Sequence, residues 1–252
     1  MEQSFIYGIN PVLEAIKASK RRCYKIVVTQ VKRSPRLRPI LDACKAQGVK
    51  VEVLPRDVFQ KKYRSVTHQG VIGYFSEKES IPLDELIRRA FEESPQPTLA
   101  ILDGIQDPQN LGAIIRSAEV LGVQGLVLPQ RRVAPLNETV SKCSSGAVEN
   151  LPVAWVTNLA RAMEQLKESK FWIVGVDPRG EKSCDRFKFD MPTALLIGGE
   201  EKGIRPLLRK ACDFTVSIPM RGAVESLNVS AASAVIFYEI LKQKAENLRR
   251  KG

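Results

Sequence analysis

The second half of the chain alternates short apolar segments with helical segments, and this pattern limits the fold more than any other feature. Six apolar runs begin at Thr98 or later: Leu99–Leu102, Gly125–Leu128, Val153–Val156, Trp172–Val176, Ala194–Ile197 and Thr215–Ile218. Continuous apolar runs between helices are typical of strands buried on both faces of a mostly parallel sheet. We therefore expect an α/β domain over residues 98–252, ending in a helix over Val229–Leu248 whose first half is buried.

The first 75 residues predict a second, smaller α/β domain. Their spacing indicates helices and strands in alternation, and residues 76–97 are mostly polar with three prolines, as in a linker with a helical piece near Leu83–Glu92. The expected helices are Asn10–Ala18, Leu37–Gln47 and Arg56–Tyr63, and the expected strands are Lys25–Thr29, Lys50–Leu54 and Gly70–Phe75.

The positive charge of the chain is concentrated in this first part. The net charge is +11 over 252 residues; residues 1–77 carry 15 Lys and Arg against 6 Asp and Glu, a net charge of +9, and the rest carry 24 against 22, a net charge of +2. A charged surface that only aids solubility would also be basic, but clusters within one segment favour binding to a nucleic-acid backbone. The clusters are Lys20–Arg22, Lys32–Arg33, Arg36 with Arg38, and Lys61–Arg64.

Several classes of protein are disfavoured by what the sequence lacks. No apolar run approaches the roughly 20 residues of a membrane span, and the first residues do not resemble a signal peptide, so we expect a cytoplasmic protein without membrane contact. The chain has one histidine, His68, and five scattered cysteines, which speaks against a multi-histidine metal site or a disulfide framework. The glycine patterns of Rossmann and P-loop nucleotide sites and of the hydrolase elbow are missing.

Three polar segments follow predicted strands, where ligands of open α/β sheets bind. They span residues 102–118, 195–204 and 218–230. Each also has an ordinary structural interpretation: Asp107 before Pro108 is a typical helix cap, Gly198–Gly199 can form a simple turn, and Ser226 or Asn228 can cap the last helix. Asn110 and Arg116 are six residues apart, about 240° around a helix, so spacing alone does not place them together.

Taken in order, the three segments resemble the motifs of the SpoU (TrmH-type) ribose 2′-O-methyltransferases of the SPOUT superfamily. The matching patterns are D-P-x-N-L-G-x-x-x-R-S-A, I-G-x-E-x-x-G-I and I-P-M followed by S-L-N-V-S-x-A, and they cover roughly residues 98–245, with Ser145–Ala147 as a further short match. Residues 6–15 and 68–71 are similar to the accessory RNA-binding domain of the family, which resembles ribosomal protein L30e. The arrangement is most similar to the branch that methylates a guanosine of 23S rRNA.

The resemblance implies a fold and a cofactor that the residue pattern alone does not give. It implies a deep trefoil knot in the C-terminal domain, whose loops hold S-adenosylmethionine, an L30e-like domain over residues 1–75 that binds RNA, and a homodimer with the active site near the subunit interface. The implied cofactor-binding residues are Gly198, Gly199, Ile218, Leu227 and Asn228. The implied catalytic residues are Asn110, Arg116, Glu200, Ser226 and Asn228, and no metal is needed.

The chemistry implied is the deprotonation and alignment of a ribose hydroxyl. The resemblance implies Arg116 as the base, but arginine normally stays protonated. Arg116 acts either as a base with a lowered pKa or as a charged group that holds a phosphate and stabilises the developing alkoxide, and we favour the second role. Methylation of tRNA, or a non-catalytic role in RNA binding and ribosome assembly, are the alternative functions.

Overall fold

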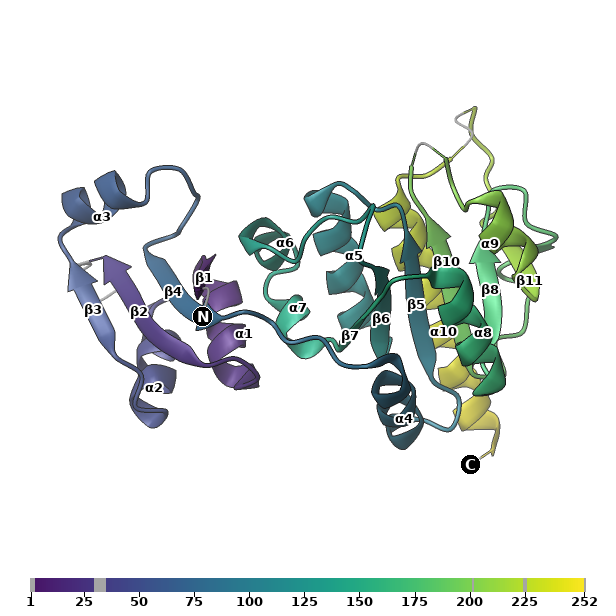
Figure 1. The fold of residues 1–252 in the computed structure, drawn as a ribbon, viewed down its shortest axis with the longest axis horizontal. Coiled ribbons are helices and arrows are strands. Elements are labelled where there is room, and N and C mark those ends of the chain that lie inside the picture. Colours follow the sequence, from purple (N-terminus) through teal and green to yellow (C-terminus); the bar gives the residue numbers. More distant parts are fainter. Residues whose placement is uncertain (1–2, 30–34, 201, 224–225, 252) are drawn as a thin grey trace. The chain divides into compact units, whose positions relative to one another are not determined.

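The computed structural model describes residues 3–29, 35–200, 202–223 and 226–251, so Lys32 and Arg33 of the basic clusters lie outside the described residues. The chain forms two compact units (Figure 1). The first contains Met1–Glu79 together with Pro135–Asn150, and the second contains Ser80–Ala134 together with Leu151–Gly252. The segment 135–150 therefore belongs by its contacts to the N-terminal unit.

The second unit is built on a seven-stranded sheet in the order β7-β6-β5-β10-β8-β11-β9. Every pairing among these strands is parallel, which confirms the mostly parallel sheet predicted from the apolar runs. The two-residue strand β9 was not predicted. The strands are β5 (Thr98–Asp103), β6 (Gly125–Pro129), β7 (Val153–Val156), β8 (Trp172–Val176), β9 (Lys182–Ser183), β10 (Thr193–Gly198) and β11 (Phe214–Ser217).

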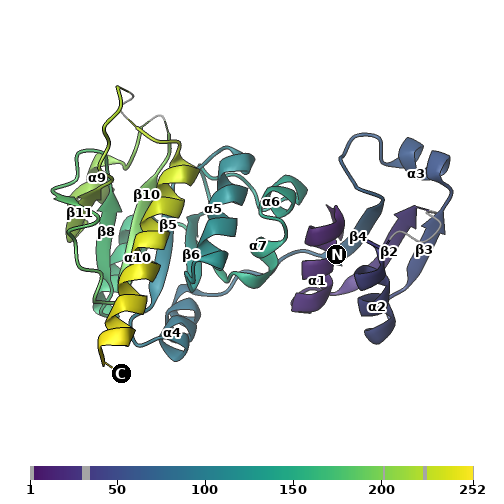
Figure 2. The same ribbon diagram turned by 180° about the vertical axis from the view of Figure 1, so that it is seen from behind.

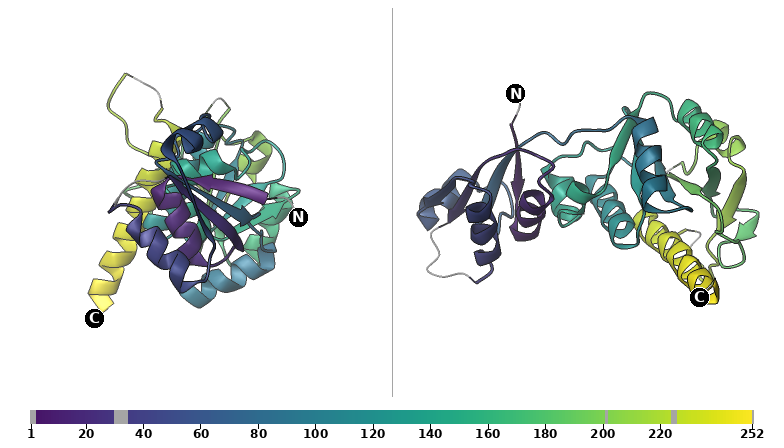
Figure 3. Two further views of the ribbon diagram at one scale, coloured as in Figure 1. Left: turned by 90° about the vertical axis from the view of Figure 1, so that its left-hand side faces the viewer. Right: turned by 90° about the horizontal axis from the view of Figure 1, so that it is seen from below.

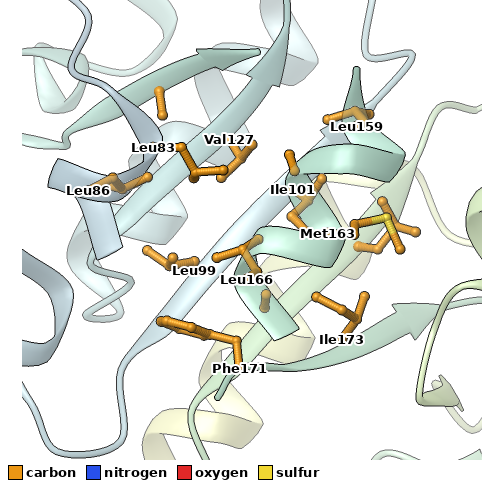
Figure 4. Close-up of a cluster of buried hydrophobic side chains, with 14 of the residues drawn as sticks. Leu83, Leu86, Leu99, Ile101, Val127, Leu159, Met163, Leu166, Phe171 and Ile173 are labelled. Atoms are coloured by element: carbon orange, nitrogen blue, oxygen red, sulfur yellow. The ribbon is translucent and has the colours of Figure 1, made fainter. Parts of the chain in front are cut away.

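Helices cover both faces of this sheet. On one face, α4 (Leu83–Glu93), α8 (Leu159–Glu168) and α9 (Pro206–Lys210) pack against Leu99, Ile101 and Val127 in one apolar core (Figure 4). On the other face, α5 (Pro108–Val120) and α10 (Val229–Lys251) lie side by side (Figure 2). Helix α10 is one continuous helix up to residue 251 (Figure 3), as the final apolar-to-charged segment predicts.

The first unit has a four-stranded sheet in the order β1-β4-β2-β3. Only β2 and β3 are parallel; β4 is antiparallel to both of its neighbours. One apolar cluster joins the sheet to α1 and α2, and a second joins it to α3. The elements are β1 (Gln3–Tyr7), α1 (Ile9–Ala18), β2 (Cys23–Thr29), α2 (Arg38–Ala46), β3 (Val51–Leu54), α3 (Arg56–Lys62) and β4 (Val71–Ser76).

Helices α6 (Glu138–Cys143) and α7 (Ala147–Asn150) complete this unit. Gly146 lies between them with a φ of 90°, and a Cβ atom there would meet Glu14 and the backbone of Pro11. Arg21 and Glu149 form an ion pair of 3.1 Å whose side chains are 7% and 1% exposed. A buried pair of this kind joins segments that are 128 residues apart in the sequence.

Candidate active site

The candidate site lies in the second unit, where the loops after neighbouring parallel strands meet. β10 pairs with β5 in a register that sets Gly198 beside Asp103, so the two strands end together. The amide nitrogen of Gly199 then donates to the Asp103 carbonyl at 2.8 Å. Since β8 is the other neighbour of β10 and β11 lies next to β8, the loops after all four strands leave the same edge of the sheet.

Three side chains from the three polar segments form one hydrogen-bonded cluster. The amide of Asn110 donates to Glu200 Oε1 at 2.9 Å, and the amide of Asn228 donates to the same oxygen at 2.6 Å. Asn228 Nδ2 also lies 3.0 Å from Asn110 Oδ1. The sequence placed these residues on separate loops, and the structure brings them into direct contact.

Two members of the cluster lie at helix starts, Asn110 in the first turn of α5 and Asn228 directly before α10. The side chain of Asp107 accepts hydrogen bonds from the backbone of Gln109 and Asn110, so the predicted cap of α5 is confirmed. Asn228 Oδ1 accepts from the amide nitrogen of Ser230 at 2.9 Å and so caps α10. Asn228 therefore combines the capping role with a place in the cluster, because its oxygen faces the helix and its nitrogen faces Glu200.

An apolar pocket of about 330 Å³ lies on one side of the cluster. Its size falls within the roughly 300–1,000 Å³ of ordinary ligand sites. All five residues expected to bind the cofactor line it, together with Ser226 and Glu200. The residues of this pocket come from the ends of β8, β10 and β11 and from the start of α10: Val176, Asp177, Pro178, Ile197, Gly198, Gly199, Glu200, Gly203, Ile218, Met220, Ser226, Leu227, Asn228, Val229 and Ala232.

The apolar pocket is lined mainly by aliphatic side chains, with two carboxylate residues among them. Valine, isoleucine and leucine side chains supply apolar walls, and the carboxylates of Asp177 and Glu200 lie on the same lining. A Cβ atom at Gly198 would lie 2.1 Å from the carbonyl carbon of Gly203, so the loop closes on itself only with glycine there. The sequence analysis did not identify Asp177 as a pocket residue, because no glycine-rich motif follows β8. Its position directly after a strand was the feature that could have indicated it.

A polar cavity of about 550 Å³ lies on the other side of the cluster. Glu200, Gly199, Gly203 and Val229 line both spaces, whereas Asn110 lines only the polar cavity and Asn228 only the apolar pocket. The polar cavity is lined by Asp103, Gly104, Ile105, Gln106, Asp107, Asn110, Arg132, Gly199, Glu200, Lys202, Gly203, Arg205 and Val229. The cluster therefore lies between the apolar pocket and the polar cavity and borders both of them.

Arg116 is the one expected catalytic residue that lies outside both spaces. It is exposed on α5, six residues beyond Asn110, and it forms no ion pair within the described part of the chain. Six residues of helix turn through about 240°, so Arg116 and Asn110 lie on different sides of α5. A single chain therefore does not bring Arg116 to the Asn110–Glu200–Asn228 cluster.

The fold and the two cavities define a class of protein: an α/β protein with an apolar pocket beside a polar cavity at the carboxyl ends of its parallel strands. A model of the SpoU rRNA methylase family matches residues 97–238, and a model for RNA 2′-O ribose methyltransferase substrate binding matches residues 5–81. The chain belongs to the SpoU rRNA methylase family. This membership confirms the resemblance and the class of RNA methyltransferase expected from the motifs.

Individual relatives extend over nearly the whole chain. The 23S rRNA (guanosine-2′-O-)-methyltransferase RlmB of Shewanella oneidensis is 39% identical over 96% of this chain and 98% of its own length. The protein of the same name from Pectobacterium atrosepticum is 37% identical over 95% and 98%. The crystal structure of the SpoU methyltransferase AviRb from Streptomyces viridochromogenes in complex with AdoMet has a TM-score of 0.80 at 25% identity, covering 97% of this chain and 91% of AviRb.

Two further expectations concern membranes and metals. Among the residues that the structure describes, no helix is long and apolar enough to cross a membrane. The same residues contain no group of three or more His, Cys, Asp or Glu side chains arranged to hold a metal ion.

Proposed function

We propose that the protein transfers a methyl group from S-adenosylmethionine to the ribose 2′-hydroxyl of a guanosine in 23S rRNA. The observation that carries the proposal is the Asn110–Glu200–Asn228 cluster, which stands between an apolar pocket and a polar cavity. Direct transfer requires the methyl donor and the hydroxyl to touch, so the two ligands would have to meet where the two cavities adjoin, beside Glu200 and Val229.

The apolar pocket suits S-adenosylmethionine. When bound, this cofactor supplies an activated methyl group on a sulfonium with a neutral thioether as leaving group. Ile197, Ile218 and Leu227 would cover its adenine ring, and the turn at Gly198 and Gly199, packed on the backbone of Gly203 and Gly104, would shape the pocket. Of the two carboxylates on the lining, Asp177 pairs with Arg209, and Glu200, engaged only by neutral amides, is the one whose negative charge can face the sulfonium.

The polar cavity would hold the ribose. Glu200 is engaged by two amides, so its carboxylate is fixed in position and in turn fixes Asn110. Asn110 lines the polar cavity, where its side chain would orient the ribose hydroxyl for in-line attack. Ser226, exposed beside Leu227, would contact the cofactor side of the site.

Arg116 requires a second subunit in this proposal. Helices α5 and α10 share one face of the sheet, and α10 exposes Val235, Tyr238 and Leu241 at 41%, 57% and 40%. Val235 neighbours Tyr238 and Tyr238 neighbours Leu241 at a spacing of three residues, so the three side chains form an apolar strip that winds partly around the helix. A homodimer that covers this strip would place Arg116, on α5, at the subunit boundary, where its charge can hold an RNA phosphate and stabilise the developing alkoxide.

The N-terminal domain would select the RNA. Residues 1–75 carry most of the excess positive charge, and residues 98–252, apart from 135–150, would perform the transfer. Residues 76–97 would connect the two, although their helix α4 packs in the core of the second unit. A cytoplasmic location follows from an rRNA substrate. The trefoil knot remains a prediction of the family resemblance.

The proposal is tested by mapping 2′-O-methyl groups after the purified protein is incubated with S-adenosylmethionine and either 23S rRNA or total tRNA. We expect one new 2′-O-methylguanosine in the 23S rRNA. Methylation of tRNA alone would replace the substrate, and RNA binding without any methylation would indicate a non-catalytic assembly factor.

A further inference from the structure

The polar cavity has a basic side to which neither the sequence motifs nor the proposed transfer step assigns a role. Arg132, Lys202 and Arg205 line it; Arg132 comes from the loop after β6, and Lys202 and Arg205 come from the loop between β10 and α9. Its three carboxylates are all engaged by the protein itself. Asp107 caps α5, Glu200 accepts from two asparagines, and Asp103 pairs with Arg205. The positive charge of the cavity is therefore more available to a ligand than the negative charge.

Arg205 is anchored by a buried carboxylate. Asp103, at the end of β5, is 3% exposed, and it accepts a hydrogen bond of 2.8 Å from Arg205 Nε, whereas the Arg205 side chain is 42% exposed. Within the described residues, this bond uses only one of the three guanidinium nitrogens. A guanidinium fixed at Nε keeps two terminal nitrogens for a forked contact with a phosphate, and anchoring lowers the entropy lost on binding.

Arg132 is held in an uncommon backbone conformation beside the same cavity. Its φ is 64°, in the left-handed region that side chains other than glycine, asparagine and aspartate seldom adopt. Two residues later, the amide nitrogen of Ala134 donates to the Ile105 carbonyl at 2.8 Å and ties this loop to the loop after β5. Strained residues of this kind occur at binding sites more often than elsewhere.

We propose that the polar cavity receives the target nucleotide of the RNA, and that Arg205 and Arg132 bind the phosphates on either side of it. Asp103 is a positioning residue in this arrangement, because it acts through Arg205. The inference rests on the proposed methyl transfer and adds the residues that hold the RNA backbone at the transfer site. Lys202, exposed on the same lining, adds positive charge without a fixed geometry.

The test compares Arg205→Ala and Arg132→Gly with Arg161→Ala, a control that removes an exposed arginine of α8. The measurements are the affinity for a 23S rRNA fragment without cofactor at several salt concentrations, the affinity for S-adenosylmethionine by calorimetry, and steady-state kinetics. We expect RNA affinity to fall roughly tenfold in each cavity variant. The slope of log affinity against log salt should fall by about 0.7–0.9 for each lost phosphate contact.

Arg132→Gly separates a binding role from a structural one. Glycine adopts the left-handed backbone freely, so this variant should melt at the same temperature as the wild type or higher. We expect it nevertheless to bind RNA weakly and to raise KM for RNA more than it lowers kcat. If Arg205→Ala fails to fold because Asp103 loses its partner, Arg205→Lys keeps a charge there, and it should bind RNA with intermediate affinity.

The outcomes distinguish this inference from the proposed function. Wild-type RNA affinity and salt slope in Arg132→Gly, in a protein that still methylates RNA, would overturn the phosphate assignment alone. Loss of RNA affinity and of salt slope in the cavity variants, with S-adenosylmethionine affinity unchanged, would support it. A wild-type protein that binds no S-adenosylmethionine would overturn the proposed function instead.

Discussion

The side-chain amide of Asn228 donates a hydrogen bond of 2.6 Å to Glu200 Oε1. Asn228 begins the last helix, and Glu200 lies in the loop after β10, so the bond joins the two segments that enclose the apolar pocket. Because the Asn228 oxygen caps α10 at the same time, the direction of the amide is fixed. The position of Glu200 in the site thus depends on the start of α10.

Asn228→Asp should abolish methyl transfer while leaving the protein folded. Aspartate caps a helix as well as asparagine does, so α10 keeps its start, but the donor to Glu200 is replaced by a second negative charge. The matched control is Asn158→Asp, since Asn158 caps α8 in the same way, away from both cavities. Initial rates and melting temperatures check the pair; equal activity of the two variants would remove Asn228 from the site.

Gly198→Ala should remove binding of S-adenosylmethionine or prevent folding. A Cβ atom there would lie 2.1 Å from the Gly203 carbonyl carbon and 2.2 Å from the Ile204 nitrogen, so backbone would have to move. Gly222→Ala is the control, because a Cβ atom at Gly222 meets nothing within 4 Å. Calorimetric titration with the cofactor measures the difference, and wild-type affinity in Gly198→Ala would show that this loop does not shape the pocket.

Arg116→Ala should keep cofactor affinity and lose methyl transfer. Arg116 is exposed on α5 and lines neither cavity, so its removal leaves the apolar pocket intact. A lost transition-state contact lowers kcat and kcat/KM together. Turnover near that of the wild type would exclude Arg116 from the mechanism.

Lys244→Met should change how stability depends on pH. Burial lowers the pKa of Lys244 to about 8 from an ordinary value of 10.5, although its ammonium donates to Gln96 O and Thr98 Oγ1, both at 2.6 Å. Below pH 8 the charge is present in both folded and unfolded chains, and its burial lowers the free energy of unfolding. Between pH 8 and 10.5 the unfolded chain binds more protons than the folded one, so the wild type gains stability as pH rises.

The methionine variant lacks this gain. Its free energy of unfolding relative to that of the wild type should therefore fall as the pH is raised from 8 to 10. Lys242→Met provides the comparison, because Lys242 is exposed on the same helix and its pKa is raised by Glu239. Urea denaturation at each pH gives the free energy of unfolding of each protein. If the difference in this free energy between Lys244→Met and the wild type stays constant with pH, the lowered pKa of Lys244 is contradicted.

The local pattern of the sequence predicted the sheet well, because strands buried on both faces have a direct signature in continuous apolar runs. β9 has only two residues and makes no such run, and β1 was not predicted as a strand. The inclusion of 135–150 in the N-terminal unit depends on contacts such as Arg21 with Glu149, across 128 residues. A local sequence pattern cannot show that residues so far apart in the chain are in contact.

The candidate site was predictable in its loops but not in its contacts. Polar segments after strands marked Asn110, Glu200 and Asn228, yet their shared hydrogen bonds depend on strand order, which places β10 beside β5. The Asp103–Arg205 pair spans 102 residues and lies in no recognised motif. The role of Arg116 could not be assigned from spacing, and a single chain leaves it exposed.

The most direct measurement is calorimetric titration of S-adenosylmethionine into the wild type, Leu227→Arg and Leu207→Arg. Leu227 lines the apolar pocket, whereas Leu207 is 72% exposed on α9 and lines neither cavity, so the same substitution fills the site in one variant and only alters the surface in the other. We predict one cofactor bound per chain in the wild type and in Leu207→Arg, and none in Leu227→Arg. Absence of binding to the wild type, or undiminished binding to Leu227→Arg, would contradict the assignment of this pocket.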